Sequence, residues 1–306
     1  MPAPRIRPAP SRAPDHGWGR MESPGVRPDR NSGGNDMRGF PFGRAEEHLR
    51  HVPMVAALGL RFLALGPGRA SMAMPPVAAT RGTADGPPHA GAVVALLDHL
   101  SSCAVFAALD RYRPTATLDL RLDFMAPPDV PGEITAGAEC LALDGDVAHV
   151  RAEARQADGR LVALSTAVFM IGNFPGTSAA EDDLAQPGGP AALPPADMLF
   201  PALCRIEDDA DGYRLQPCRH LIGATPLPAL HGGAIGALLL EAATRAGRGR
   251  RLRSLSIHYL RPAPAGPLLA AVRTERDGRR AASLALAALE RAGGPALALG
   301  RASLAD

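Results

Sequence analysis

The chain has 306 residues, a hydrophobic content of 46% and a formal net charge of +2. This length predicts two domains of ordinary size, and the apolar content is sufficient for packed cores. The near-neutral charge argues against a dedicated nucleic-acid binder, and no uninterrupted apolar run reaches the length of a membrane span. The four cysteines form no CxxC pair, so we expect reduced thiols and a cytoplasmic location.

Two segments have the composition of unstructured chain. Residues 1–42 are rich in Pro, Arg and Gly, show no hydrophobic periodicity and lack the apolar core of a secretion signal. They cannot bury enough apolar surface to offset the ordering entropy, so we expect a disordered tail. Residues 174–196 are similar in composition and are predicted to be a linker. The two domains are therefore expected at 43–173 and 197–306.

In the first expected domain, a short helix is predicted near 44–58, followed by a hairpin of strands 60–65 and 69–74. A helix is expected at 91–109. It is apolar nearly all round, so a sheet should wrap around it. Four more strands are predicted, at 117–125, 132–143, 147–157 and 161–171.

The second expected domain repeats this order of elements. A hairpin is predicted near 203–218 and a helix at 233–245. Four strands are predicted to follow, at 253–260, 268–276, 281–290 and 296–304.

One motif occurs in both domains, as HAGAVVALLD at 89–98 and as HGGAIGALLLE at 231–241. Each copy has a loop His, then small residues, then an apolar run that ends in a carboxylate, Asp98 or Glu241. Each is followed by an alternating strand that ends at a proline. A unit repeated at this distance indicates two copies of one domain. A carboxylate inside an apolar helix calls for a structural or functional explanation, because burial of an unpaired charge costs much free energy.

With these residues the chain resembles tandem hotdog proteins of the acyl-CoA thioesterase kind, the branch with phenylacetyl-CoA-type and 4-hydroxybenzoyl-CoA-type thioesterases. The strand ends FMAP at 124–127 and YLRP at 259–262, and the turn DGRLVA at 158–163, also carry the resemblance. It covers about 44–306. It implies an α+β fold in which two tandem hotdog domains, each an antiparallel sheet wrapped around a long helix, pair as an intramolecular pseudo-dimer.

The resemblance also implies the activity, which is hydrolysis of acyl-CoA thioesters to free acid and CoA. Acyl-CoA would be the partner, without a metal or other cofactor and without nucleic-acid or membrane partners. We further expect two such chains to pair as a homodimer.

Thioester hydrolysis needs a nucleophile or an activated water, together with donors for the carbonyl oxygen. In the first copy, Asp98 is the candidate base or nucleophile. The N–H of Gly91 at the helix start is the candidate oxyanion donor, and His89 would shape the loop or bind substrate. The resemblance assigns to Thr117 a hydroxyl that helps hold the water. The alternative for Asp98 is an ion pair with an Arg between the copies.

In the second copy, His231, Gly232 and Gly233 are the candidate substrate-binding residues. Glu241 comes one residue later than the position of Asp98, and one residue is about 100° of helix rotation. We therefore expect at most one competent site in each pair, centred on Asp98. The role of Glu241 stays open between a second catalytic carboxylate and a structural one.

Other positions depart from the family pattern or add to it. Relatives often carry Asn six residues before the loop His, where this chain has Thr83 and Thr225, and Thr83 is kept as a substrate-binding candidate. Arg248 and Arg251 belong to a basic run that either binds CoA phosphates or forms a solvated loop. His99 is predicted to face another side of the helix and to serve packing.

Two other functions remain open at this point. The missing Asn residues and the displaced glutamate favour a catalytically inactive acyl-CoA-binding hotdog protein, whereas the retained Asp98 favours an enzyme. A hotdog hydratase or dehydratase would need a His and an acid converging on a β-hydroxyacyl chain. The loop His motif before the helix carboxylate favours hydrolysis.

Overall fold

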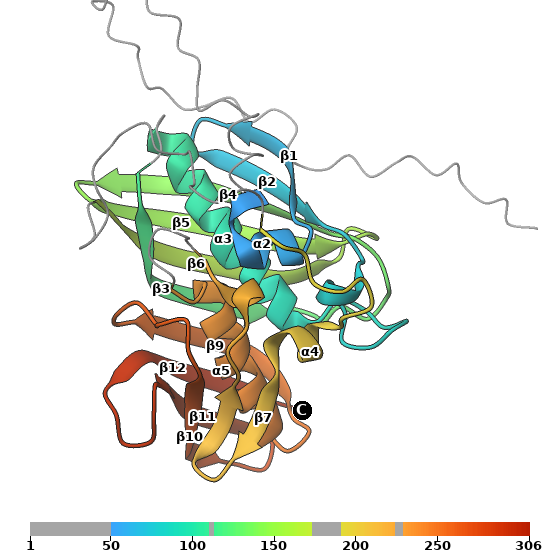
Figure 1. Ribbon diagram of the computed structural model, residues 1–306, viewed down its shortest axis with the longest axis vertical. Helices are drawn as coiled ribbons and strands as arrows, with labels where there is room; N and C mark the ends of the chain where they lie inside the picture. The colour runs from blue at the N-terminus through green and yellow to red at the C-terminus, as the bar shows by residue number, and fades with distance from the viewer. Residues whose placement is uncertain (1–49, 110–112, 173–190, 224–228) are drawn as a thin grey trace, which may run out of the picture. The chain divides into compact units, whose positions relative to one another are not determined.

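Figure 1 shows the computed structural model, which describes residues 50–109, 113–172, 191–223 and 229–306. The predicted tail, most of the predicted linker and Thr225 lie outside the described residues. So does the beginning of the helix expected near 44–58, of which the structure describes α2 at Pro53–Ala57. The proposed domain boundaries at 43–173 and 197–306 stay a prediction.

The first half of the described chain winds one part of the sheet around the helix α3, Ala90–Leu109. This helix has apolar side chains on nearly every face, so it is stable only when it is buried on all sides. Strands of alternating polarity bury it with the apolar face of the sheet. A short 3-10 helix, Ala78–Thr80, precedes the loop His. The strands are β1 Arg61–Gly66, β2 Arg69–Met74, β3 Thr115–Phe124, β4 Ile134–Asp144, β5 Val147–Gln156 and β6 Leu161–Ile171.

The second half repeats this plan around α5, Gly232–Ala246. The hairpin expected near 203–218 is preceded by an unpredicted helix, α4, at Phe200–Cys204. Proline in its first turn suits a helix start, and Arg205 ends it in a left-handed conformation with φ 42°. A 3-10 helix, Arg219–Leu221, follows the hairpin. The strands are β7 Ile206–Asp209, β8 Gly212–Leu215, β9 Arg251–Tyr259, β10 Leu268–Asp277, β11 Ala281–Leu289 and β12 Ala296–Ala305.

Within the described residues, the two halves join in one antiparallel sheet of twelve strands, in the order β1-β2-β4-β5-β6-β3-β9-β12-β11-β10-β8-β7. The junction is the pair β3 and β9, which lie side by side in Figure 1. Arg121 stands opposite Ser256, 135 positions later, and Pro262 follows Pro127 by the same 135. The strand pair is therefore symmetric about Arg121 and Ser256, as two copies of one domain require. This confirms the predicted tandem hotdog fold and its internal pairing.

The core follows the two helices. Helix α3 packs against β2, β4, β5 and α5, and α5 packs against β9, β10 and β11. Leu96, Leu97 and Leu100 are fully buried, and each such side chain contributes about 1.5–3 kcal/mol to folding. By length and composition alone α3 could cross a membrane, but 78% of its apolar window is buried inside the protein.

Candidate active site

Asp98 lies in the middle of α3 and is only 4% exposed. Its carboxylate faces the start of the other long helix, α5. Oδ1 accepts a hydrogen bond of 3.0 Å from the hydroxyl of Thr117, and Oδ2 lies 3.4 Å from Nδ1 of His231. Thr117 and Asp98 come from the first half of the chain, and His231 comes from the second. The site is therefore built across the two halves.

A β-bulge turns Thr117 toward Asp98. Strand β3 carries one residue more than its partner β6, at Leu118. With strict alternation, Thr117 would lie on the opposite face from the buried Leu120. The extra residue reverses this parity, so the hydroxyl reaches the carboxylate. Bulges are common beside active sites because they re-aim a side chain in this way.

Two glycines allow α5 to begin directly against α3. A Cβ atom on Gly233 would lie 2.5 Å from Cα of Ala95, and one on Gly232 would lie 2.7 Å from Oδ2 of Asp98. Both distances are shorter than real Cβ contacts, so neither position accepts a side chain without movement of its neighbours. Nδ1 of His231 accepts a hydrogen bond of 3.0 Å from the N–H of Gly233 and caps the helix.

The electrostatics of the site are dominated by burial. Burial raises the pKa of Asp98, against the opposing effects of His231, the Thr117 hydroxyl and the Gly233 N–H. Burial also lowers the pKa of His231. Because Nδ1 of His231 accepts from the N–H of Gly233, the ring carries no proton on Nδ1 in this arrangement. Burial favours the neutral forms of both His231 and Asp98.

Tyr259 and His99 complete this corner of the site. The hydroxyl of Tyr259 donates a hydrogen bond of 3.0 Å to the carbonyl oxygen of Gly232. Burial and the nearby charge of Asp98 raise the pKa of Tyr259 well above its ordinary value, so the phenol keeps its proton. His99, for which the sequence predicts only packing, lies with its ring centroid 5.6 Å from that of His231.

The sequence held a signal for Tyr259 that motif reasoning did not use. Leu255 and Ile257 are buried on β9, and Tyr259 has the same parity, so it faces the helix with them. A hydroxyl on that face, two residues beyond two buried aliphatic side chains, needs a polar partner inside the protein.

The carboxylate of the second copy, Glu241, faces the start of α3. Oε2 lies 3.9 Å from Nε2 of His89, and Oε1 accepts a hydrogen bond of 2.7 Å from Arg245. The N–H of Gly91 donates to Nδ1 of His89 at 3.0 Å. The structure thus places His89, with the Gly91 N–H that it accepts, on the side of Glu241 and does not bring these two residues to Asp98. Seven residues of helix put Gly91 roughly 10 Å from Asp98, and the pseudo-dimer pairs each helix start with the other carboxylate.

Symmetry shows which residue types replace those of the Asp98 site. Strand β9 has its own bulge at Arg253, 135 positions after Leu118, so Leu252 takes the place of Thr117. By the same offset Phe124 takes the place of Tyr259. Within the described chain, the two positions that carry hydroxyl groups beside Asp98 are thus apolar in the other half.

Phe200 of α4 fills the space beside Gly91. Its ring stacks on His89 with centroids 4.7 Å apart, and a Cβ atom on Gly91 would lie 2.7 Å from the Phe200 ring. In the motif itself Ala90 stands where the second copy has Gly232. The two helix starts are therefore not equivalent, and the more polar one serves Asp98.

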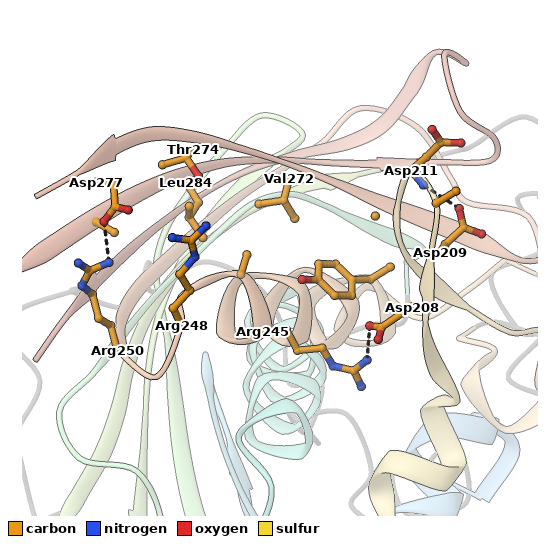
Figure 2. A pocket seen from close by; sticks show the side chains of 15 residues that line it. Asp208, Asp209, Asp211, Arg245, Arg248, Arg250, Val272, Thr274, Asp277 and Leu284 are labelled. Carbon is orange, nitrogen blue, oxygen red and sulfur yellow. Dashed lines mark hydrogen bonds and ion pairs between the residues drawn. The ribbon is translucent and has the colours of Figure 1, made fainter.

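A hollow of about 720 Å³ lies at the C-terminal end of α5 (Figure 2). Arg248 lines it beside the ion pairs Arg245–Asp208 and Arg250–Asp277, so the hollow carries charges of both signs. Helix α5 has 15 residues, which places this end roughly 20 Å from the helix start that faces Asp98.

Two other predicted binding residues also lie away from the buried carboxylate. Arg251 opens β9 near the same end of α5 and is exposed. Thr83 is exposed in a turn in which its carbonyl oxygen accepts from the N–H of Gly86 at 3.1 Å. The structure does not bring Arg248, Arg251 or Thr83 into the Asp98 site, and their roles stay predictions. Within the described residues, no group of three or more His, Cys, Asp or Glu could hold a metal ion.

Family profiles match both halves of the chain. The profile described as thioesterase superfamily matches residues 88–163, which contain α3 and Asp98. The profile described as acyl-CoA thioesterase N-terminal domain matches residues 224–305, which contain α5. Together they cover more than half of the chain. A comparison with curated proteins gave no match.

Solved structures share the double architecture. The tesB protein of Mycobacterium avium subspecies paratuberculosis is 16% identical with a TM-score of 0.53, and the alignment covers 82% of this chain and 97% of that one. A protein of Novosphingobium aromaticivorans assigned as a thioesterase is 20% identical, with coverage of 77% and 94% and a TM-score of 0.52. At these identities the likeness is one of fold. The family profiles carry the assignment further, and the chain belongs to the thioesterase superfamily as a thioesterase with two hotdog domains in tandem.

Proposed function

We propose that this thioesterase hydrolyses acyl-CoA at one site, with Asp98 as the reacting carboxylate. The family supports acyl-CoA thioester hydrolysis in general. The observation that carries the assignment of the site is the placement of Asp98. One oxygen of this buried carboxylate is held by Thr117, and the other is turned toward the start of α5. A buried acid that contacts a helix start is arranged for chemistry on a carbonyl group.

In the proposed reaction, Oδ2 of Asp98 is the reacting atom, because Oδ1 accepts from Thr117. Oδ2 either removes a proton from the attacking water or attacks the thioester carbon itself, in which case water then releases the acid. In the first route the C–S bond breaks, and Asp98 returns the proton taken from water to the leaving CoA sulfur. In the second route the C–S bond breaks as the acyl-Asp98 anhydride forms, and CoA leaves as a thiolate. Water then hydrolyses the anhydride to the acid and the carboxylate, and the proton released in that step converts the thiolate to the thiol. Burial disfavours the ionised form of Asp98, so the ionised carboxylate is a stronger base than an exposed aspartate.

The start of α5 supplies the oxyanion donors in this scheme. Backbone N–H groups at a helix start, aided by the helix dipole, stabilise negative charge on the thioester oxygen. His231 keeps the N–H of Gly233 directed into the site, and a thioester oxygen competes with Nδ1 for that donor. The absence of side chains at Gly232 and Gly233 leaves room for the close approach that this needs.

The surroundings of Glu241 support a structural part for this residue. Its carboxylate is held by Arg245, the helix start opposite it is covered by Phe200, and Leu252 replaces the hydroxyl. We therefore propose a single working site in each chain. Pairing of two chains and a cytoplasmic location remain predictions.

The hydratase alternative is favoured by one observation, since His231 and Asp98 do converge. However, Nδ1 of His231 is used to cap α5, so this ring is not positioned as a separate base. The family profiles also match thioesterases. Hydrolysis is therefore the reaction that the site supports best.

The direct test is release of free thiol by the purified chain from a panel of acyl-CoAs that differ in length and aromaticity. We expect hydrolysis of at least one member, with no added metal. Binding of acyl-CoA without thiol release would favour the inactive alternative. Formation of β-hydroxyacyl-CoA from an enoyl-CoA would favour the hydratase.

The pH dependence of kcat/KM should show the raised pKa of Asp98. The reacting form is ionised, so activity should be present above the pKa of the folded protein and lost as pH falls through it. Because burial raises that pKa, the acid limb should lie above the ordinary aspartate value of 3.8. An acid limb at or below that value would contradict a buried base.

The same group should affect stability in the opposite sense. The folded state favours the protonated form of Asp98, so the free energy of unfolding should fall as pH rises from the ordinary value through the raised one. Comparison of thermal melts of the parent and the Asp98→Asn variant across that window isolates this contribution.

A further inference from the structure

We propose that Tyr259 is a positioning residue, whose hydroxyl holds the peptide between Gly232 and Gly233 so that its N–H faces Asp98. This inference rests on the proposed function and extends it to a residue that the reaction scheme does not use. It is carried by two hydrogen bonds on one peptide group. Tyr259 binds its carbonyl oxygen at 3.0 Å, and His231 binds its N–H at 3.0 Å.

Holding one side of a peptide fixes the other side. The peptide group is planar and almost always trans, so the carbonyl oxygen of Gly232 and the N–H of Gly233 point in opposite directions. A hydrogen bond to the oxygen therefore sets the direction of the N–H. If the plane turned over, the carbonyl oxygen would face the carboxylate, and an oxyanion donor would become an acceptor.

This peptide lies in the first turn of α5 and between two glycines, so the helix holds it less firmly than it would hold a peptide between other residues. Glycine reaches backbone conformations that other residues avoid, so a Gly-Gly peptide can turn over more easily than others. The glycines cannot be replaced by stiffer residues, because a Cβ on either would collide with Asp98 or Ala95. The hydrogen bond from the hydroxyl of Tyr259 restricts the rotation of this peptide that the two glycines would otherwise permit.

The first half of the chain provides an internal comparison. There the first small residue of the motif is Ala90 instead of glycine, and the position of Tyr259 is taken by Phe124, which has no hydroxyl. The tyrosine thus occurs only at the helix start that carries the Gly-Gly pair and faces Asp98. This difference between the halves is expected if the tyrosine restrains the peptide only at the proposed working site.

The surroundings keep Tyr259 a donor. Asp98 and His99 from α3, and His231 from the start of α5, are the titratable groups at this corner. Burial and the charge of Asp98 both hold the pKa of Tyr259 well above its ordinary value. The hydroxyl therefore donates to Gly232 over the whole pH range in which the enzyme would be assayed.

The experiment compares the parent with Tyr259→Phe, which removes the hydroxyl and keeps the buried ring. Tyr213→Phe is the matched control, because it removes the hydroxyl of another tyrosine in the same half, beside Arg245 and away from Asp98. Steady-state kinetics use the best substrate of the acyl-CoA panel. Hydrogen exchange of the Gly233 amide, with β11 amides as internal reference, measures the restraint without any need for activity.

For Tyr259→Phe we expect kcat to fall by about tenfold to a hundredfold, the range below full loss of an oxyanion donor, with KM changed by less than about twofold. The acid limb of the pH profile should move upward, because the N–H of Gly233 lowers the pKa of Asp98. Exchange of the Gly233 amide should become faster relative to β11. Tyr213→Phe should match the parent in all three measurements.

The outcomes separate this inference from the proposed function. An active parent with unchanged kcat, acid limb and exchange in Tyr259→Phe would overturn the role of Tyr259 and leave Asp98 in place. If the parent released no thiol, the proposed function would fail, and exchange at Gly233 would still decide the restraint. Equal loss of kcat in both tyrosine variants would show a general packing effect and would also overturn it.

Discussion

Asp98→Asn should abolish thioester hydrolysis while the protein stays folded. The amide keeps the shape of the carboxylate and can still accept from Thr117, but it cannot remove a proton from water or attack a thioester. Loss of such a group costs about a hundredfold or more in rate. The measurement is kcat/KM for thiol release, together with the melting temperature of both proteins. The variant should be at least as stable as the parent above the pKa of Asp98, because it carries no buried charge.

Glu241→Gln is the matched control for this substitution, since it makes the same chemical change on the other helix. Its carboxylate is partly exposed and paired with Arg245, so we expect a change in activity far below that of Asp98→Asn. Thiol release at the parent rate by Asp98→Asn would show that the proposed site is wrong. A loss in Glu241→Gln as large as in Asp98→Asn would point to two working sites.

The tandem fold could be predicted from the sequence because its signals are local and occur twice. The apolar surface of the segment at 91–109 predicts a buried helix, which the structure extends by one residue to Ala90. The strand ends predicted from the alternation of polar and apolar residues mostly lie within a few residues of the strand ends in the structure. The hairpin near 203–218 was predicted less well. In this part of the chain α4 overlaps the expected hairpin and each strand has only four residues, so the sequence shows little periodicity.

The composition of the site could be predicted only in part, because chain neighbours are not site neighbours in a pseudo-dimer. The motif suggests that Asp98 works with Gly91 of its own helix. The pairing of β3 with β9 instead brings the two helices together so that Asp98 meets Gly232 and Gly233. The sequence shows that Glu241 is displaced by one residue from the motif position of Asp98. It does not show that Glu241 accepts a hydrogen bond from Arg245.

Thr117 shows a second limit of pattern reasoning. Alternation alone directs its side chain away from the helix, and only the bulge at Leu118 turns it inward. The resemblance to the family suggested this residue where periodicity could not. For Arg248 the sequence signal was clear and the prediction of its place was not supported. The basic run is obvious in the sequence, but it lies at the far end of α5, roughly 20 Å from Asp98.

Gly233→Ala should remove both activity and a large part of the stability. The added methyl group would lie 2.5 Å from Cα of Ala95, and a backbone atom cannot move aside as a side chain does. The helices α3 and α5 must therefore separate, at a cost of about 1–3 kcal/mol or more in the free energy of unfolding. Separation also moves the Gly233 N–H away from Asp98, and a misplacement of about 1 Å costs about a hundredfold in rate.

Two further glycine variants make the result specific. Gly232→Ala places its methyl group 2.7 Å from a carboxylate oxygen of Asp98, which can turn aside, so this variant should fold with a smaller loss of stability and yet lose activity. Gly266→Ala meets no atom within 4 Å and should match the parent in both respects. Denaturant unfolding and thiol release measure the series. Parent-like activity in Gly232→Ala and Gly233→Ala together would mean that the contact between the start of α5 and Asp98 does not form the active site.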